Sequence, residues 1–388
     1  MEEEHFSVQT AKNEDSANTE TYGIFLRRYL ACSQCNKMIL EKIFLQNFRN
    51  YESQLFEFSS QTTLLVGPNS IGKTNALEAI FLLATGTSFR SNLDEEMIEY
   101  DKEIARVKGQ LKAKEKENLE IILTRGEVAG KKTHKKHYFL NSVKKRKQDF
   151  VGRLSCVFFG PDDLKIIINS PSTRREYLDQ VLEQASWEYR RANLSYQKTL
   201  RQRNRLLEQI REREKPVSSL FFWDKLLIEN GEKITYKREE FIDFVNGQPD
   251  YFGDLEIAYE KSIVSPERLK KYQQKEIASA MTLVGPHRDD FIISQVNGEK
   301  IRDLHKFGSR GEQRTAIFSL KLSELEYLSR ELSKRPVLLL DDIFSELDHE
   351  RRIRLLEVIP KQQTIITTAD IHMVEKEKRE KMKLIELS

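Results

Sequence analysis

Alternating apolar and polar positions dominate residues 39–159 and predict a series of short strands. The stretch 39–58, ILEKIFLQNFRNYESQLFEF, predicts two strands around a turn, and residues 105–126 and 137–147 predict two hairpins. Between the first two stretches, TTLLV at 62–66 is short, apolar and β-branched, which is typical of a buried strand. This part of the chain is therefore predicted to be mainly antiparallel β-structure around one buried strand.

The pattern changes to a helical one near residue 170. Residues 174–215 place apolar side chains three and four positions apart with dense charge between them, which predicts helix throughout. Pro216 ends that pattern, and residues 221–245 predict a returning helix, so the two helices are expected to pack as a short antiparallel arm. Residues 282–298 return to a strand pattern, and the remainder alternates helix and strand, as in an α/β protein.

Length and composition narrow the class of protein. The chain has 388 residues, enough for two or three domains, and is 39% hydrophobic and 32% charged. No apolar run is long enough to span a bilayer, the acidic N-terminus is no secretory signal, and three cysteines imply no disulfide framework, so we expect a cytoplasmic protein. Because the net charge is only +3, any nucleic-acid surface must be a local patch.

Four segments follow from these changes in pattern. Residues 1–37 lack periodicity and are predicted to be a disordered extension, and Met38 is a possible alternative start. Cys32 and Cys35 form a lone C-x-x-C without a second ligand pair, which disfavours a zinc site. The other predicted segments are a first α/β lobe with its β subdomain, a helical insertion and the remainder of the lobe, at 38–169, 170–280 and 281–388.

The spacing of Gly67, Gly72, Lys73 and Thr74 matches the phosphate-binding pattern G-x-x-x-x-G-K-[ST]. The predicted strand before it and the apolar helix pattern after it supply the required context, because loop N–H groups and a helix N-terminus then face the phosphates. Lys73 is predicted to reach the β- and γ-phosphates, and Thr74 to bind Mg²⁺. The alternative is a glycine turn before a core helix. The predicted ATP-binding residues are Gly67, Pro68, Asn69, Ser70, Ile71, Gly72, Lys73 and Thr74.

A second carboxylate motif follows an apolar run at 337–340, which predicts a strand buried on both faces. Its C-terminal end carries Asp341 and Asp342, at the edge where ligands bind in open α/β sheets. Asp341 is predicted to order Mg²⁺ and Asp342 to polarise the attacking water. Two solvated aspartates in a turn are the alternative.

A third motif, FGSRGEQR at 307–314, precedes an amphipathic helix. Small residues before a helix N-terminus form an anion site, and Ser309, Gly311 and Gln313 are the candidates here. Two phosphate-binding helix N-termini so far apart in sequence suggest a nucleotide held between two copies of the chain.

The densest basic cluster lies in the predicted strand region of residues 100–159 and is a candidate DNA surface. A solvated hairpin face is the alternative. Arg174 and Arg175, and Arg201 and Arg203 of the predicted arm, are rivals of lower rank. The candidate DNA contacts are Lys131, Lys132, Lys144, Lys145 and Lys147.

Taken together, the motifs resemble an ABC-type ATPase of the SMC superfamily, and within it the RecF family of bacterial recombination mediators. The resemblance runs from Met38 almost to the C-terminus, and VGPHRDDF together with LDDIFSELD is its most specific part. The matching stretches, in family order, are NFRNYESQLFEF, GPNSIGKTNALEAIFLLATGTSFR, FFGPDDLKIIINSPSTRREYLDQ, YQKTLRQRNRLL, VGPHRDDF, GSRGEQRTAIFSLKLSE, LLLDDIFSELDHERR and TIITTAD.

The resemblance implies a P-loop ATPase head with an antiparallel β subdomain and an inserted helical arm. It makes Lys73, Asp341 and Asp342 the catalytic residues, and residues 309–313 a signature motif that reaches ATP on the opposite subunit. Residues 345–348 would form the D-loop, and Thr367 and Thr368 the switch. It further implies an ATP-dependent homodimer that binds DNA, works with RecO and RecR to load recombinase at gaps, and supports the SOS response.

Several positions depart from the family pattern. Ser70 and Ile71 replace a small and a polar loop residue, Glu312 stands where glutamine is commoner, and Asn141–Ser142 lacks the usual turn glycine. Because Asp342 is shorter than glutamate, we expect slow ATP turnover, as in a switch. Alternatives are an SMC-type chromosome organiser, a phage-defence ATPase and a transporter subunit, but the chain is too short for a long coiled coil or an appended nuclease.

Overall fold

A five-stranded parallel sheet carries both of the predicted nucleotide motifs, in the strand order β11-β16-β17-β4-β18. Asp341 pairs with Thr367 on the neighbouring strand, and Thr367 pairs with Leu65 on the next. Because the strands are parallel, their carboxyl ends lie at one edge, so Asp341 and the loop after β4 face the same side. The strands are β4 (Thr62–Val66), β11 (Cys156–Phe159), β16 (Val337–Asp341), β17 (Thr364–Thr368) and β18 (Lys383–Glu386).

The computed structural model describes residues 36–91, 93–112, 116–248, 255–297, 300–345, 347, 349–373 and 376–388. Residues 37–388 form one unit by their contacts. Residues 1–35 of the predicted extension, which include Cys32 and Cys35, lie outside the described residues. Among the described helices, none is long and apolar enough to cross a membrane.

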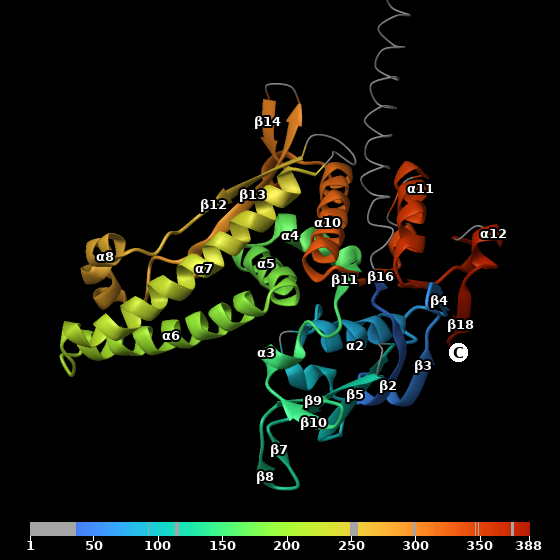
Figure 1. The fold of residues 1–388 in the computed structure, drawn as a ribbon, viewed down its shortest axis with the longest axis horizontal. Coiled ribbons are helices and arrows are strands. Elements are labelled where there is room, and N and C mark those ends of the chain that lie inside the picture. Colours follow the sequence, from blue (N-terminus) through green and yellow to red (C-terminus); the bar gives the residue numbers. More distant parts are fainter. Residues whose placement is uncertain are drawn as a thin grey trace, which may run out of the picture. The chain divides into compact units, whose positions relative to one another are not determined.

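A six-stranded antiparallel sheet shares its apolar core with helix α2 (Lys73–Thr85), in the order β10-β9-β6-β5-β2-β3. It contains the three predicted hairpins, so these predictions are confirmed (Figure 1). Asn141 and Ser142, where the turn glycine is missing, adopt φ of 49° and 65° and form the two-residue turn themselves. The strands are β2 (Leu40–Phe48), β3 (Tyr51–Glu57), β5 (Ile104–Leu111), β6 (Glu117–Thr124), β9 (Lys136–Leu140) and β10 (Val143–Lys145).

The helical insertion differs from the predicted continuous helix. Ser186 is extended at φ −134° and ψ 123°, and its side chain caps the next helix by accepting from the Tyr189 N–H. The chain therefore forms α5 (Pro171–Ala185), which contacts α10 (Arg310–Leu332), and a separate α6 (Trp187–Arg211). Helix α6 packs along α7 (Phe221–Asn246) as the predicted arm (Figure 1).

The motif VGPHRDDF links the arm to a three-stranded sheet with the strand order β12 (Leu255–Glu260), β13 (Asp290–Asn297) and β14 (Lys300–Asp303). The buried Asp289 carboxylate accepts hydrogen bonds from Arg238 of α7, from the Tyr259 hydroxyl and from the Ser262 N–H. Asp290 forms a two-bond ion pair with Arg174 of α5, at 2.6 and 2.9 Å. Both aspartates therefore have a structural role, which no pattern in the sequence assigned to them.

The remaining elements are short apart from two helices of ten or more residues. They are β1 (Asn36–Lys37), β7 (Glu127–Val128), β8 (Lys131–Lys132), α3 (Lys147–Phe150), α4 (Lys165–Ile168), β12 (Leu255–Glu260), α8 (Pro266–Ser279), β13 (Asp290–Asn297), β14 (Lys300–Asp303), α9 (Leu304–Phe307), β15 (Lys334–Arg335), α11 (His349–Val358) and α12 (Lys376–Arg379).

Candidate nucleotide-binding and DNA-binding sites

The loop between β4 and α2 has the backbone of a phosphate cradle. Ser70 and Gly72 both adopt positive φ, at 68° and 118°. At Gly67 a β-carbon would lie 2.7 Å from the Leu387 carbonyl oxygen, so only glycine fits without a shift. The loop ends directly at Lys73, the first residue of the buried helix α2, so helix N–H groups and loop N–H groups converge. This conformation fits a nucleotide phosphate chain.

Lys73 is folded back onto the loop. Its ammonium donates to the carbonyl oxygens of Gly67 and Pro68, at 2.6 and 2.8 Å. Burial lowers the pKa of Lys73, and the nearby carboxylates of Asp342 and Asp341 oppose that effect. The ammonium is thus held within the loop by weak neutral acceptors, which phosphate oxygens can replace.

Thr74, Asp341 and Thr367 form one hydrogen-bonded cluster across three elements. The Thr74 hydroxyl lies 2.9 and 3.0 Å from the two carboxylate oxygens of Asp341, and the Thr367 hydroxyl donates to the same carboxylate at 2.7 Å. Asp341 is buried at the end of β16. These hard oxygen ligands suit Mg²⁺, so the predicted metal residues Thr74 and Asp341 are brought together.

Asp342 has a distinct geometry directly after the strand. It adopts φ of 49°, and its N–H donates to the Thr367 carbonyl oxygen at 3.2 Å. The backbone therefore leaves the extended strand conformation directly after Asp341. Of the predicted D-loop, Leu347 is buried, whereas Glu346 and Asp348 lie outside the described residues.

The third motif forms the N-terminus of α10. Ser309 caps the helix in a reciprocal capping box with Glu312, whose carboxylate accepts from the Ser309 N–H at 2.7 Å and whose pKa this bond lowers. A β-carbon at Gly311 would meet no atom within 4 Å, so the surface there is open. Gln313 points inward, because its buried amide donates to the Leu304 carbonyl oxygen at 2.8 Å.

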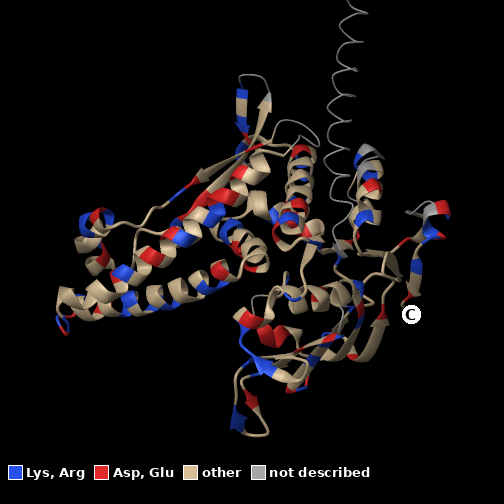
Figure 2. Cartoon of the chain, viewed as in Figure 1, with Lys and Arg blue, Asp and Glu red and all other residues tan. Residues whose placement is uncertain are grey.

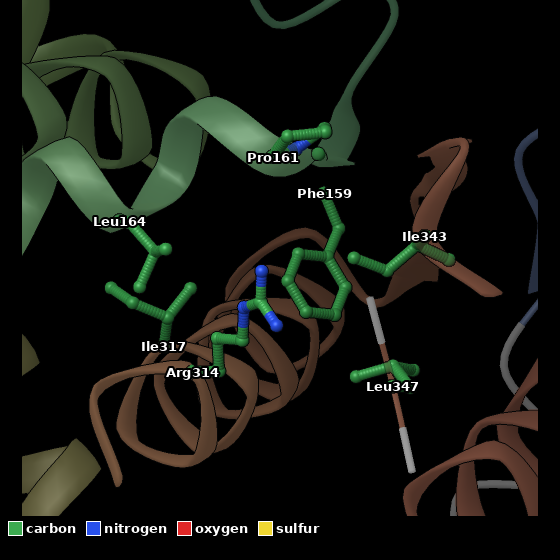
Figure 3. Close-up of a pocket in the computed structure, with 8 residues that line it drawn as sticks. Phe159, Pro161, Leu164, Arg314, Ile317, Ile343 and Leu347 are labelled. Atoms are coloured by element: carbon green, nitrogen blue, oxygen red, sulfur yellow. The ribbon is translucent and has the colours of Figure 1, made fainter. Parts of the chain in front are cut away.

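A small apolar pocket joins this helix to the segment after Asp341. Arg314 and Ile317 of α10, Phe159 at the end of β11, and Ile343 all line it. Figure 3 shows the ring of Phe159 between the Arg314 guanidinium and the Ile343 side chain. The helix that carries the third motif therefore packs against the residue two positions beyond Asp341.

The turn between β2 and β3 contacts the phosphate loop, which motif spacing did not predict. The Asn50 amide donates to the Ile71 carbonyl oxygen at 2.9 Å and accepts from the Asn75 amide at 2.7 Å. Arg90 donates in turn to Asn75, at 2.8 Å. The only sequence signal for these contacts was the resemblance in the stretch NFRNY.

The predicted basic hairpin surface is present and exposed. Lys131 and Lys132 lie on β8, and Lys144 and Lys145 on the edge strand β10 (Figure 2). None of these four lysines has a carboxylate partner among the residues that the structure describes. Lys147 differs, because it pairs with Glu183 at 3.2 Å.

Three of the rival arginines are engaged in the fold. Arg174 and Arg175 bind the β13 segment, to the Asp290 carboxylate and to the Asp289 carbonyl oxygen. Arg203 is 1% exposed and pairs with two carboxylates. These contacts disfavour the three as DNA contacts, because ion pairs already hold Arg174 and Arg203 and a backbone hydrogen bond holds Arg175.

Arg201 belongs instead to an exposed basic stripe along α6, which we define as Arg191, Lys198, Arg201 and Arg205. No Asp or Glu occurs between residues 189 and 207. The stripe recurs at helical spacing, and Figure 2 shows Lys and Arg along the length of α6. Near its start, the Arg191 guanidinium lies 5.5 Å from the centre of the Trp187 ring.

Comparisons with known proteins agree with this geometry. Residues 39–386 match the family model described as the RecF/RecN/SMC N terminal domain. A "DNA replication and repair protein RecF" of Lachnoclostridium phytofermentans is 39% identical over 85% of this chain and 92% of its own. The protein of the same name from Bacillus cytotoxicus is 35% identical over 90% of this chain and 96% of its own.

Solved structures give the same result. The structure described as the recombination mediator protein RecF-ATP in the RecFOR pathway superposes with a TM-score of 0.79 at 34% identity. The match covers 87% of this chain and 94% of that chain. The corresponding RecF-ATPrS structure superposes with a TM-score of 0.77.

Proposed function

Since the chain belongs to the RecF family, and has its ABC-type ATPase fold, we propose that it is an ATP-dependent DNA-binding protein of recombinational repair and replication-gap processing. The related proteins are named for DNA replication and repair, and two solved structures are described as RecF-ATP and RecF-ATPrS. The alternative is another SMC-like ATPase that acts on DNA, in chromosome organisation or phage defence.

The hydrogen bond from Thr74 to Asp341 carries the proposal for ATP binding, because it unites the two nucleotide motifs at one edge of the sheet. Loop N–H groups between Gly67 and Thr74 hold the phosphates, and Lys73 moves from the loop carbonyls to phosphate oxygens. Thr74 and Asp341 hold Mg²⁺. When bound, this ion neutralises charge on the β- and γ-phosphate oxygens.

Hydrolysis is proposed to be slow. Asp342 follows the metal residue directly and orients a water molecule for attack on the terminal phosphate. Its side chain is one methylene shorter than a glutamate, so the carboxylate reaches less far toward that water. The protein then acts as a switch, in which ATP binding sets one state and hydrolysis ends it.

We propose that the ATP-bound state is a homodimer. The exposed N-terminus of α10 supports it, because Ser309 and Gly311 present an open helix end that suits the phosphates of a nucleotide on a second copy. Gln313 supports this surface indirectly, by holding the preceding segment through Leu304. The apolar pocket beside Ile343 couples that helix to the catalytic aspartates.

DNA is the proposed partner of the dimer, through phosphate contacts. Lys131, Lys132, Lys144 and Lys145 supply one basic surface, and the α6 stripe supplies a second. Both consist of exposed cations, and their contacts with phosphates are independent of sequence. In this proposal RecR and RecO act with the dimer at gaps in DNA to load recombinase, which supports repair and the SOS response.

Equilibrium ATP binding with and without Mg²⁺ tests the nucleotide part of this proposal. Wild type is expected to bind ATP and to hydrolyse it well below ~10 s⁻¹, the median rate of enzymes. Lys73→Met is expected to lose binding while keeping its unfolding temperature. A wild-type protein that binds no ATP, or a mutant that binds as tightly as wild type, would overturn the proposal.

A further inference from the structure

Tyr51 is a buried tyrosine whose hydroxyl lacks a hydrogen bond. The residue is 9% exposed, and its hydroxyl oxygen has no partner among the described residues. Its ring packs edge-on against Phe56 at 5.5 Å, which accounts for the aromatic part of the side chain but not for the hydroxyl. An unpaired buried hydroxyl costs free energy, so a phenylalanine would suit this state of the protein better.

The hydroxyl lies directly beneath the phosphate loop. A β-carbon at Gly72 would be 2.6 Å from the Tyr51 oxygen and 2.9 Å from the Asn50 amide nitrogen. Gly72, at φ of 118°, is the last loop residue before Lys73 and α2. Asn50 already fixes the loop through the Ile71 carbonyl oxygen. The Tyr51 hydroxyl is thus a buried donor without a partner among the described residues, in a turn that otherwise braces the loop.

The loop itself is in a state that nucleotide would change. Lys73 now donates to the carbonyl oxygens of Gly67 and Pro68, and those bonds must break if its ammonium is to reach phosphates. Acceptor oxygens in the loop then lose a donor, and phosphate oxygens enter the site. Both changes make oxygen acceptors available in the loop beside the unpaired Tyr51 hydroxyl.

We propose that the Tyr51 hydroxyl gains an acceptor oxygen only when nucleotide fills the loop, so that Tyr51 is a positioning residue for the nucleotide-bound state. This inference rests on the proposed ATP-binding function. The unpaired Tyr51 hydroxyl then destabilises the nucleotide-free protein, and its hydrogen bond stabilises the nucleotide-bound protein. The acceptor is an oxygen of the rearranged loop or of the phosphate chain.

Tyr51→Phe separates those two effects. The variant is expected to melt at or above the wild-type temperature without nucleotide, because it removes an unpaired hydroxyl. Its affinity for ATP is expected to fall about 3- to 10-fold, the value of one lost hydrogen bond. Affinity is measured by titration, and stability by thermal unfolding with and without Mg-ATP. The use of Mg-ADP distinguishes acceptors that need the γ-phosphate from those that do not.

Tyr196→Phe is the matched control. Its hydroxyl is also buried but lies 2.7 Å from Nδ1 of His287, in the arm. That variant is expected to melt below wild type and to bind ATP as wild type does. The inference is overturned if Tyr51→Phe binds ATP with wild-type affinity, or if it melts as low as Tyr196→Phe. Failure of wild type to bind ATP would instead overturn the proposed function.

Discussion

The hydroxyl of Thr74 donates to the carboxylate of Asp341, at 2.9 and 3.0 Å from its two oxygens, although 267 residues separate them in sequence. The pair is the contact point of the two nucleotide motifs. Because Thr367 donates to the same carboxylate, the position of Asp341 is set from two sides. A metal ion at this point would find its ligands already oriented.

Asp341→Asn is expected to remove the dependence of ATP affinity on Mg²⁺, because an amide supplies one neutral oxygen in place of a carboxylate. We expect a loss of about 10- to 100-fold in metal-dependent affinity. ATP titrations with Mg²⁺ and with a chelator measure it. Asp101→Asn, at an exposed position, is the control. An unchanged Mg²⁺ dependence in Asp341→Asn would exclude this carboxylate as a ligand.

Arg203 is predicted to hold the arm together. It pairs with Asp224 and Glu276, each at 2.7 Å, and Glu276 is fully buried. Arg203→Met leaves both carboxylates without their cation, so the free energy of unfolding should fall by about 3–5 kcal/mol. Arg201→Met, two positions away and exposed, should change it by less than about 0.5 kcal/mol. Urea denaturation compares the two, and equal effects would contradict the assignment of these roles.

His287 is a partly buried, neutral ring with a defined tautomer. Its Nε2 lies 3.0 Å from the Thr282 carbonyl oxygen, which only accepts, so Nε2 carries the proton. Nδ1 then accepts from the Tyr196 hydroxyl, at 2.7 Å. A second proton on this ring would remove the acceptor that Tyr196 uses.

The stability of the protein should therefore fall in acid. Burial lowers the pKa of His287 from 6.5 to about 4, with a smaller lowering from Arg288 and Arg175 and opposition from Asp289. The unfolded chain binds the extra proton below pH 6.5 and the folded chain only near pH 4, so stability is lost across that window. At pH 5 the loss from this group is about 2 kcal/mol.

His287→Gln tests that linkage, because glutamine does not titrate. The variant should be less stable than wild type at pH 7.5, and the difference should narrow by about 2 kcal/mol at pH 5. Urea denaturation at the two pH values gives the comparison. Parallel loss of stability in both proteins between pH 7.5 and pH 5 would show that other groups carry the acid sensitivity.

The two basic surfaces predict separable effects on DNA binding. Alanine at Lys198, Arg201 and Arg205 should weaken binding at every sequence and reduce the slope of log affinity against log salt by up to ~0.9 per lost phosphate contact. Alanine at Lys144, Lys145 and Lys147 should do the same if the hairpin contributes. In the second set Lys147 should add least, because Glu183 already pairs with it.

Lys233→Ala supplies the charge control for that experiment. Lys233 is exposed on α7 and pairs with Glu229 at 2.8 Å, so its removal changes net charge without removing an unpaired cation. Binding is measured as a function of salt by fluorescence anisotropy with a gapped duplex. A slope that equals that of wild type in one triple variant would exclude that surface from the contact.

Sequence alone predicted the elements whose signal is local. The glycine spacing before Lys73 and the apolar run before Asp341 each identified a strand end, and the parallel register placed both at one edge. Hairpin turns were equally predictable, including the one at Asn141 and Ser142, because two short polar residues tolerate positive φ.

Features that depend on partners distant in sequence were not predictable. Arg201 and Arg203 have the same residue type and lie on the same helix, yet only the contacts with α7 and α8 make one structural and the other exposed. The break at Ser186 was missed because helix propensity on both sides of it is high. The second helix begins there because the Ser186 side chain accepts a hydrogen bond from the Tyr189 N–H. The unpaired hydroxyl of Tyr51 depends on the fold around Gly72, which no sequence pattern specifies.

In the proposed function, ATP joins two copies of this chain into a dimer that binds DNA. Sedimentation of wild type and Lys73→Met, with and without ATP and a gapped duplex, tests it most directly. We predict that wild type becomes a dimer only with ATP and binds DNA better as that dimer, and that the mutant does neither. A wild-type protein that stays monomeric with ATP bound would rule out the ATP-dependent dimer, and the N-terminus of α10 would then be an ordinary helix cap.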